Sequence, residues 1–399
     1  MSYIQLPPLT YINKIHKYIE HTITSDKETK PIINITLYKY LNTIKGEIDN
    51  CANEWDRYKK YTNPYEYIHT PVSGTAISIC KLKPLSRSYF KMIEICNLLS
   101  ILKDMPPAIK SFHLAEGPGG FIEALADMRK TNNNTNYNTN DKYYGMTLID
   151  ENDNSIPGWS KTSDLLHKCK NIIIDYGIDK KGDLTNPDNL LYCFEKYCNT
   201  IDLITGDGGF DFSIDFNKQE MASSKLIFCQ IAFAIAMQKI GGTFIIKFFD
   251  TFTNISVNLI HLLTILYSNV YYVKPFTSRH ANSEKYIVCK NFRIHEPDRE
   301  PPMQKFLNIY KDENFDNTYG ILSIPLPYLL NVKIEECNAT CGQQQMECIS
   351  NTINLIENNS TEKLEILKKS NIQKCKNWCQ KYKLPYHKNI VSANIFLQK

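Results

Sequence analysis

The sequence predicts an α/β protein built on a doubly wound, mostly parallel sheet. Seven short apolar runs alternate with helix-like segments through the middle of the chain, and glycine-rich turns follow several of them. This alternation favours parallel strands with helices on both faces. Apolar residues make up 43% and charged residues 22% of the 399 residues, the profile of a chain that can bury a large core. A mainly disordered, collagen-like or disulfide-stapled chain is excluded.

Changes in composition divide the chain into three regions. Residues 1–90 combine helical spacing of Tyr, Ile and Leu with frequent prolines, so helices and loops are expected there. Residues 91–295 hold the alternating runs, and a helix opening after Pro84 is predicted just ahead of them. A proline-rich boundary, Glu296–Pro302, precedes residues 296–399, which have a helical pattern with polar loops. The sheet is therefore expected to carry helical N- and C-terminal extensions.

The strands are assigned to the seven apolar runs. The last two runs are too close in sequence for a helix between them, so they are predicted to pair antiparallel at the sheet edge. The asparagine-rich segment Asn132–Asn140 is expected to be a surface loop. The runs are Ser111–Leu114, Tyr143–Leu148, Asn171–Ile174, Ile201–Thr205, Thr243–Phe248, Asn269–Val273 and Lys285–Cys289.

Charge and hydropathy limit the surroundings in which the protein is expected to act. A net charge of +4 is compatible with a polyanionic partner if the basic groups cluster. The longest apolar stretch, Leu226–Met237, is shorter than the roughly 20 residues that span a bilayer. The first residues lack the pattern of a secretory signal, so an intracellular protein without a membrane partner is expected.

The 13 cysteines are expected to be reduced thiols, because the chain shows no secretory signal. Two clusters near the C-terminus, Cys337–Cys348 and Cys375–Cys379, together with His387, allow two interpretations. They could bind zinc, or their four-residue spacing could place them as pairs on apolar helix faces. The spacings are not the tight C-x2-C pairs of strong zinc motifs, so no metal is predicted.

A glycine-rich turn, Glu116–Phe121, follows the first predicted strand and opens a helix. Three glycines in four residues let the backbone approach a ligand closely, and the helix N-terminus offers unpaired N–H groups. The turn lacks the lysine of a triphosphate-binding loop. A nucleotide-sugar pocket therefore fits this turn and a triphosphate site does not, and a tight turn without any ligand is an equal alternative.

Three further segments place charged residues at strand ends. Asp207 follows an apolar strand into a second glycine turn, Lys247 interrupts another apolar run, and Glu284 precedes the last strand. Ligands of open α/β sheets bind at the carboxyl ends of the strands. Burial and a neighbouring cation both favour the neutral form of a lysine, the form that acts as a base. The alternatives are a lysine that extends from the strand end into solvent and a solvated surface glutamate.

Taken in order, these segments resemble the FtsJ/RrmJ-like superfamily of RNA 2′-O-ribose methyltransferases. The likeness covers about Asn63 to Lys290, and it is closest to the branch that methylates the first transcribed nucleotide of mRNA caps in eukaryotes and large DNA viruses. It implies a Rossmann-like class I methyltransferase fold. Carried over position by position, the family's catalytic Lys-Asp-Lys-Glu tetrad corresponds to Lys91, Asp207, Lys247 and Glu284.

The resemblance also implies S-adenosylmethionine as the cofactor. Two positions depart from the family: His113 stands where an acidic residue is common, and Ser86 stands where cap enzymes often have Asn. The implied cofactor residues are Glu116, Gly117, Pro118, Gly119, Gly120 and Phe121 at the methionine and ribose end, Thr147 beside the ribose and adenine, Asp183 and Leu184 near the adenine, and Asp207.

The implied reaction converts a cap-0 end to cap-1 by in-line attack of the ribose 2′-OH on the methyl group. Lys247 is expected to act as the base with Lys91 beside it, while Asp207 and Glu284 orient both lysines. The scheme requires no metal. Capped mRNA is the expected partner, and the residues expected to bind it are Lys59, Lys60, Tyr65, Arg279 and Asn282.

Other readings stay open at this point. Tyr58 and Tyr61, which lie beside those lysines, could be core residues rather than cap contacts. A methyltransferase of the same fold could act on rRNA or tRNA, and an inactive homologue could bind RNA within a capping or polymerase assembly. The intact tetrad argues against the inactive homologue. The resemblance also implies a large DNA virus as the source, with the protein in the host cytoplasm, a viral factory or the virion.

Overall fold

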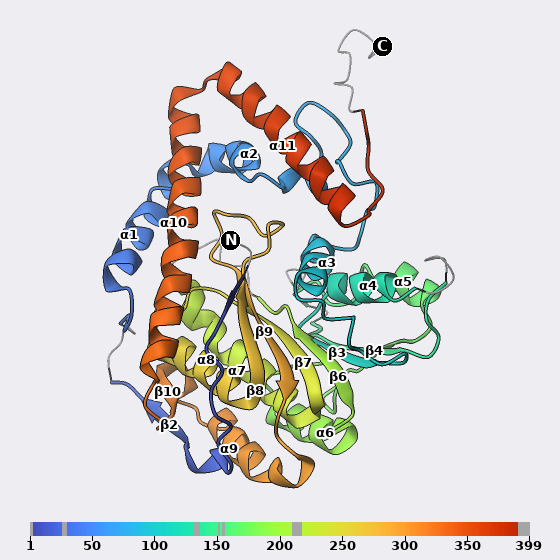
Figure 1. The fold of residues 1–399 in the computed structure, drawn as a ribbon, viewed down its shortest axis with the longest axis vertical. Helices are drawn as coiled ribbons and strands as arrows, with labels where there is room; N and C mark the ends of the chain where they lie inside the picture. Colours follow the sequence, from blue (N-terminus) through green and yellow to red (C-terminus); the bar gives the residue numbers. More distant parts are fainter. Residues whose placement is uncertain are drawn as a thin grey trace.

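The computed structural model, which describes residues 3–25, 30–130, 136–150, 152–153, 156–209 and 218–389, contains a central eight-stranded sheet (Figure 1). The strand order is β1-β8-β9-β7-β6-β3-β4-β5. The strands from β3 to β7 run parallel, and β9 lies antiparallel between β7 and β8. This arrangement confirms the doubly wound, mostly parallel sheet. The strands are β1 (Tyr3–Gln5), β3 (Lys110–Leu114), β4 (Lys142–Met146), β5 (Ile172–Ile174), β6 (Ile201–Gly206), β7 (Gln238–Phe248), β8 (Tyr267–Val273) and β9 (Lys285–Phe292).

The N-terminal segment adds a strand that the sequence did not predict. β8 and β9 pair antiparallel as expected, but β8 is not the edge, because β1 pairs with it from Tyr3 opposite Val273 to Gln5 opposite Tyr271. A second strand, β2 (Ile19–Ile23), pairs with β10 (Thr318–Leu322) in a separate two-stranded sheet. The terminal regions are therefore not purely helical. These short strands mix apolar residues with polar ones or glycine, so no continuous apolar run marks them in the sequence.

Helices cover both faces of the sheet, as the alternation predicts. Along β7, Phe244 and Ile246 point into the core beneath α6, α7 and α8, whereas Ile245 points into the core beneath α3 and α4. Lys247 continues this alternation on the α3 and α4 side. The predicted helix after Pro84 is α3, and it begins at Ser88. The helices are α3 (Ser88–Leu98), α4 (Gly120–Met128), α5 (Ser163–Lys168), α6 (Pro187–Tyr197), α7 (Gln219–Met237) and α8 (Asn254–Leu266).

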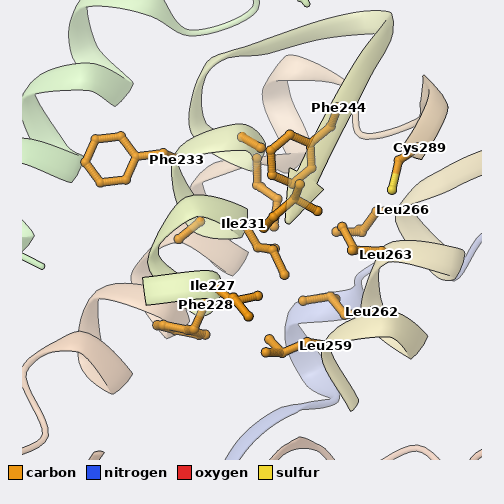
Figure 2. Packing of buried hydrophobic residues seen from close by; sticks show 14 of the residues in the cluster. Ile227, Phe228, Ile231, Phe233, Phe244, Leu259, Leu262, Leu263, Leu266 and Cys289 are labelled. Carbon is orange, nitrogen blue, oxygen red and sulfur yellow. The ribbon is translucent and has the colours of Figure 1, made fainter. Parts of the chain in front are cut away.

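Helix α7 is the central helix of the larger core. Figure 2 shows Ile227 and Ile231 of this helix facing Leu259 and Leu262 of α8. Within the described residues, α7 is also the one helix that is long and apolar enough to cross a membrane by length and composition alone. Because 83% of its most apolar window is buried inside the protein, its apolar character is accounted for by the core.

The N- and C-terminal extensions pack against each other. Helix α10 contacts α1 and α2, and α11 contacts α2 and the short helix Glu66–Ile68. The chain after α11 pairs with residues near Cys80, because the Lys81 N–H donates to the Pro385 carbonyl at 2.9 Å. Figure 1 shows α2 and α11 above the end of the sheet where the loop between β8 and β9 projects. These helices are α1 (Ile35–Gly46), α2 (Ala52–Thr62), α9 (Glu300–Tyr310), α10 (Tyr328–Asn358) and α11 (Thr361–Lys381).

Two predicted loop features fall partly outside the described residues. Residues 132–135 of the asparagine-rich segment and Phe210, which follows the turn at Asp207, are among them. The turn itself is described up to Gly209, so the position of Asp207 can be compared with that of its neighbours.

Candidate active site

Strand register brings together two of the charged residues at the carboxyl end of the sheet. Gly206 of β6 pairs with Ile246 of β7, so the next residues, Asp207 and Lys247, lie side by side. The distance from Lys247 Nζ to Asp207 Oδ1 is 3.3 Å, and Nζ also donates to the Asp207 backbone carbonyl at 2.7 Å. Lys247 Nζ therefore lies within reach of two acceptor oxygens of Asp207.

The other lysine and carboxylate of the predicted tetrad form a second pair. Lys91 lies on α3, and Glu284 ends the loop that enters β9. Lys91 Nζ is 2.7 Å from Glu284 Oε1 and 2.8 Å from Oε2. Both residues are buried, with exposed fractions of 6% and 7%. The structure therefore places all four residues of the predicted tetrad at one end of the sheet.

Tyr286 joins the two pairs, although nothing in the sequence marks it as a site residue. Its hydroxyl donates to Asp207 Oδ1 at 2.8 Å and accepts from Lys91 Nζ at 3.4 Å. Tyr286 lies opposite Lys247 in the β7–β9 pairing. In the sequence it stands in an apolar strand where a tyrosine needs no functional explanation. Only the pairing of β7 with β9 distinguishes it from a core residue.

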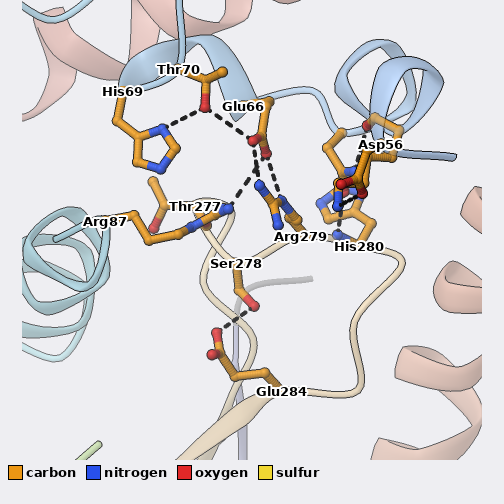
Figure 3. A network of polar contacts seen from close by, with 12 residues as sticks. Asp56, Glu66, His69, Thr70, Arg87, Thr277, Ser278, Arg279, His280 and Glu284 are labelled. Atoms are coloured by element: carbon orange, nitrogen blue, oxygen red, sulfur yellow. Dashed lines mark hydrogen bonds and ion pairs between the residues drawn. The ribbon is translucent and has the colours of Figure 1, made fainter. Parts of the chain in front are cut away.

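The Glu284 carboxylate is held in its charged form. Burial by itself would raise the pKa of Glu284, but Lys91 and Lys247 together hold it well below the ordinary value. Ser278 also donates to Glu284 Oε1 at 2.8 Å, as Figure 3 shows. A permanently charged carboxylate at this position can orient Lys91 without exchanging protons near neutral pH.

The glycine-rich turn presents a buried carboxylate to the same region. Glu116 Oε1 accepts a hydrogen bond from the Phe121 N–H, at the start of α4. Among the described residues, Glu116 Oε2 is buried and has no hydrogen-bond partner. Burial, followed by the nearby charge of Asp207, raises the pKa of Glu116 well above its ordinary value. Two carboxylates that repel each other in a buried place form an environment suited to a cationic ligand.

The glycines of this turn are packed against protein atoms rather than open space. A Cβ atom added at Gly120 would lie 2.2 Å from the hydroxyl oxygens of Ser86 and Ser88. One added at Gly117 would lie 2.5 Å from the Gly158 carbonyl oxygen. The missing side chains therefore serve close approach between chain segments, in addition to any room that they leave for a ligand.

The predicted cofactor segment at Thr147 meets the turn, and the segment at Gly182 packs against Thr147. The Gly117 N–H donates to Thr147 Oγ1 at 3.3 Å, and a Cβ atom at Gly182 would lie 2.4 Å from the Thr147 carbonyl oxygen. Asp183 Oδ1 accepts from the backbone N–H and hydroxyl of Thr185, each at 2.8 Å, so this oxygen holds its own turn. The side chain of the neighbouring Leu184 belongs to the main hydrophobic core.

Trp159 is a second residue near the turn that the sequence analysis did not single out. Its ring lies against Gly145 and Gly119, because a Cβ atom at Gly145 would be 2.6 Å from the ring and one at Gly119 would be 3.6 Å from it. The Trp159 Nε1–H is buried and has no partner among the described residues. The turn therefore has both an acceptor and a donor that a ligand could satisfy. These groups fit a nucleoside cofactor that carries positive charge, such as S-adenosylmethionine.

A pocket of about 130 Å³ lies beside the loop between β8 and β9. Lys45, Lys59 and Arg279 contribute three cations, and Trp55 contributes an aromatic ring. No carboxylate is among the described residues that line it, although each cation also has a carboxylate partner in the structure. The remaining lining residues are Ile48, Gln219, Ala281, Asn282, Ser283 and Gln345.

Three of the residues predicted to bind substrate, Lys59, Arg279 and Asn282, therefore line one pocket. Lys60 and Tyr65 do not. The Tyr65 ring packs on Phe276, with 5.3 Å between ring centroids.

Tyr58 and Tyr61 make packing contacts, as expected if they are core residues rather than cap contacts. Tyr58 is buried and donates to Asn359 Oδ1 at 2.7 Å, and Tyr61 packs against the small cluster around Tyr58.

Glu66 fixes the position of Arg279. Figure 3 shows its carboxylate facing Arg279, Arg87 and Thr70. Arg279 donates from Nε to Oε2 at 2.9 Å and from a terminal nitrogen to Oε1 at 2.7 Å, while Arg87 lies 3.6 Å away. Burial would raise the pKa of Glu66, but these arginines lower it to about 2. The bidentate pair holds the guanidinium in one orientation at the mouth of the pocket.

The C-terminal cysteine clusters lie on helices. Cys337 belongs to α10, and Cys375 and Cys379 belong to α11, where all three are buried. All 13 cysteines are free thiols. In the described part of the chain, no group of three or more His, Cys, Asp or Glu residues is arranged to hold a metal ion.

Comparisons with known proteins give one family and a set of relatives. A family model described as FtsJ-like methyltransferase matches residues 84–292, just over half of the chain. The cap-specific mRNA (nucleoside-2′-O-)-methyltransferase 1 of Homo sapiens is 35% identical over 253 residues, which is 61% of this chain. That of Ailuropoda melanoleuca is 32% identical over 254 residues. The match spans 29% of the length of both relatives, so this chain corresponds to less than a third of each.

A solved structure, a putative ribosomal RNA methyltransferase from Plasmodium falciparum, aligns with 52% of this chain and 97% of its own. Its sequence identity is 22% and its TM-score is 0.35.

Proposed function

This chain belongs to the FtsJ-like methyltransferase family, and on that premise we propose that it methylates the ribose 2′-OH of the first transcribed nucleotide of capped mRNA. The cofactor is S-adenosylmethionine, and the product is a cap-1 end. Capped RNA is proposed as the substrate because the relatives named above are cap-specific mRNA methyltransferases at 32–35% identity.

One observation carries the proposal: a buried lysine–carboxylate pair, Lys91 and Glu284, and a partly buried pair, Lys247 and Asp207, meet at Tyr286, at the carboxyl end of the sheet. A ribose hydroxyl is a poor nucleophile near neutral pH, because its proton must leave as it attacks. A lysine on the last residues of a strand, held between fixed acceptors, can accept or stabilise that proton. The buried carboxylate of Glu116 lies at the same end of the sheet, and its Oε2 atom has no hydrogen-bond donor among the described residues.

We assign the roles as follows. Lys247 contacts the 2′-OH as the neutral amine and takes its proton as the hydroxyl oxygen attacks, and Asp207 holds the ammonium group that results. Lys91, held by Glu284, contributes a second positive charge near the reacting hydroxyl. When bound, S-adenosylmethionine supplies a methyl group activated by a sulfonium centre. Glu116 and the segments around Thr147 and Asp183 bind it so that the hydroxyl, methyl and sulfur are aligned.

The pocket beside the β8–β9 loop is the proposed site for the capped end of the RNA. Lys45, Lys59 and Arg279 present positive charge to a triphosphate bridge, and Trp55 offers a face on which a positively charged methylguanine could stack. Asn282 lines the same pocket within two residues of Glu284, so an RNA held there reaches the predicted tetrad over a short distance.

Two other functions differ from this proposal in their substrate or activity. Methylation of rRNA or tRNA would use the same tetrad without the charged pocket, whereas an inactive RNA-binding subunit would need neither Lys247 nor Glu116. The pairing of Asn63 and Glu66 with the loop that carries Arg279 favours the capped substrate, since it orients a cation in that pocket. A viral source, the host cytoplasm as location and further capping proteins as partners stay predictions.

The test is a methyl-transfer assay with three short RNAs of the same sequence. One carries an unmethylated cap, one a guanine-7-methyl cap and one a 5′-triphosphate without a cap. Transfer to the ribose of the first nucleotide in either capped RNA, and not in the uncapped RNA, is the expected result. Equal transfer to all three, or transfer only to structured rRNA or tRNA, would contradict the proposal.

We predict that Lys247→Met lowers the rate of methyl transfer by at least about 100-fold, because general base catalysis contributes 10²–10⁴-fold. Met has nearly the length of Lys but cannot take a proton. Cofactor affinity, measured by calorimetry, should change less than about twofold. Lys239→Met on the same strand is the control, since Lys239 is exposed. Equal losses of cofactor affinity and rate would show that Lys247 binds the cofactor instead.

A further inference from the structure

The loop between β8 and β9, Lys274–Glu284, carries three of the residues in the proposed site. Arg279 and Asn282 line the charged pocket, and Glu284 pairs with Lys91. The loop contains no helix or strand, so its shape depends on side chains that bind its backbone. Lys274 closes it from within, by donating from Nζ to the carbonyls of Asn282 at 2.5 Å and Glu284 at 2.6 Å.

The first half of the loop is bound by Glu94 of α3. Its carboxylate accepts from the backbone N–H of Phe276 at 2.7 Å and of Thr277 at 3.1 Å. The Thr277 hydroxyl donates to the same carboxylate at 3.0 Å. Glu94 is 1% exposed, and its fourth donor is the indole Nε1–H of Trp378, at 3.4 Å. Trp378 lies on α11. The C-terminal extension therefore contacts the Glu94 carboxylate, which in turn binds the first half of the loop.

The second half of the loop is bound from α10. Gln345 donates from Nε2 to the Ala281 carbonyl at 3.1 Å, and Gln345 is 4% exposed. The neighbouring His280 N–H donates to Asn63 Oδ1 at 2.8 Å. Gln345 also lines the charged pocket. Two different helices of the C-terminal extension therefore act on the two halves of one loop.

We propose that α10 and α11 form a brace that fixes the β8–β9 loop, and that Gln345 and Trp378 are positioning residues for methyl transfer. The inference rests on the proposed function where it concerns RNA, and on geometry alone where it concerns the loop. An unbraced loop samples many backbone conformations, and only one of them places Arg279 and Glu284 correctly. Because rates are sensitive to misplacement of about 1 Å, small movements of this loop reduce transfer.

The first experiment compares Gln345→Leu with Gln343→Leu. Both substitutions are on α10, but Gln343 is exposed and donates only to Glu347 of its own helix, at 2.9 Å. Hydrogen exchange of the full chain is followed by mass spectrometry. Loss of one buried hydrogen bond should make the amides of Lys274–Glu284 exchange about five- to tenfold faster in Gln345→Leu than in the control. Amides of the β3–α4 turn should be unaffected.

The kinetic readout separates positioning from folding. In Gln345→Leu, kcat/KM for guanine-7-methyl-capped RNA should fall about five- to tenfold. The KM for S-adenosylmethionine should match that of the control, and the thermal midpoint should fall by no more than about 2–4 °C, the effect expected of one lost hydrogen bond. If exchange rises throughout the protein by the same factor as in the loop, Gln345 is merely structural and the proposal is wrong.

Trp378→Phe tests the other half of the brace. Phe keeps an aromatic ring against Phe90 and Tyr382, whose centroids lie 5.9 and 4.5 Å from Trp378, but it removes the Nε1–H. The amides of Phe276 and Thr277 should then exchange faster. Unchanged loop exchange in both Gln345→Leu and Trp378→Phe would overturn the brace, whether or not the protein methylates RNA. Faster loop exchange in a protein that methylates no capped RNA would support the brace and reject the proposed function.

Discussion

Glu116 shows how a single buried side chain can be unfavourable for folding and useful for binding. Burial and, after it, the proximity of Asp207 raise the pKa of the carboxyl group, so the folded protein disfavours the charged form. One of its oxygens also has no hydrogen-bond partner in the described part of the chain. A cationic ligand would reverse that balance, because it would pair with the charged carboxylate. The free energy that burial costs in the empty protein would be recovered when the cofactor binds.

Glu116→Gln should therefore stabilise the protein and weaken the cofactor complex. At pH 7.5 the free energy of unfolding should rise by about 1–2 kcal/mol, because an amide replaces a disfavoured buried charge. Because the pKa of Glu116 is raised in the folded state, this residue lowers the stability of the protein more as pH rises. The stability gained by Glu116→Gln should therefore be smaller at pH 5 than at pH 7.5. Cofactor affinity should fall about tenfold, equivalent to about 1.4 kcal/mol.

Urea unfolding and calorimetry measure the two effects, with the exposed Glu195→Gln as the control. A variant that is less stable than the parent at pH 7.5 would show that the Glu116 carboxylate has a favourable partner in the folded protein.

Single residues also mark where sequence reasoning stops. Asp207, Lys247 and Glu284 could be singled out because each is a charge at the end of an apolar run. Tyr286 and Trp159 could not, because an aromatic residue in or near a strand is ordinary in a core. Glu66 is similar: its role depends on Arg279, which lies 213 positions away, and nothing local in the sequence indicates that partner.

The secondary structure elements divide in the same way. All seven apolar runs became strands of the sheet, because strands buried on both faces need continuous apolar sequence. β1, β2 and β10 escaped prediction, since each is exposed in part and mixes apolar residues with polar ones or glycine, so no continuous apolar run marks it. The position of β1 at the edge depends on pairing with β8, about 270 residues away. A long-range pairing of this kind leaves no periodicity to detect.

The turn at Gly182 offers a test of how tightly the cofactor segments are packed. Gly182 and Gly241 both have positive φ values, of 65° and 78°. A Cβ atom would meet the Thr147 carbonyl oxygen at 2.4 Å in the first case and nothing within 4 Å in the second. Gly241→Ala should cost about 1 kcal/mol, the price of the backbone conformation alone. Gly182→Ala should cost about 2–4 kcal/mol, because the backbone at Thr147 must also move.

Chemical denaturation of both variants measures the difference, and cofactor titration gives a second readout. Only Gly182→Ala should weaken cofactor binding, since Thr147 belongs to the proposed pocket. Similar unfolding free energies for the two variants would mean that the backbone at Thr147 can move at little cost. The close approach of Gly182 to the Thr147 carbonyl would then contribute little to stability.

Across the whole molecule, the methyltransferase core follows from sequence and the arrangement of the extensions does not. The core is built from local alternation of strands and helices, which a sequence displays directly. The extensions meet through contacts such as the Lys81 N–H to the Pro385 carbonyl and Asn371 to the Tyr61 carbonyl, which join residues about 300 positions apart. Their helical character was predictable, but their position around the β8–β9 loop was not.

The same large core encloses histidines that must stay neutral, and this gives the protein a defined response to acid. His113 is fully buried on β3, where its ring nitrogens are 2.8 Å from the Ser111 hydroxyl and 2.7 Å from the Thr205 hydroxyl. Burial lowers the pKa of His113 to about 3, and it lowers the pKa of His261, on α8, to about 4. Both are ordinary histidines in the unfolded chain, with a pKa near 6.5.

These values predict the direction and size of acid destabilisation. Between pH 6.5 and 4 the unfolded chain binds protons that the folded chain does not, so the free energy of unfolding falls as pH falls. From pH 7 to pH 4.5, each histidine should remove about 2–3 kcal/mol, a large share of the roughly 5–15 kcal/mol of a typical domain. Guanidinium unfolding at the two pH values measures the loss.

In His113→Gln, which cannot titrate, the loss should be smaller by about 2–3 kcal/mol than in the parent. His167→Gln, at an exposed position, is the control. If His113→Gln and the parent lose the same free energy between pH 7 and 4.5, then protonation of His113 is accommodated in the folded core and burial is not what sets its pKa.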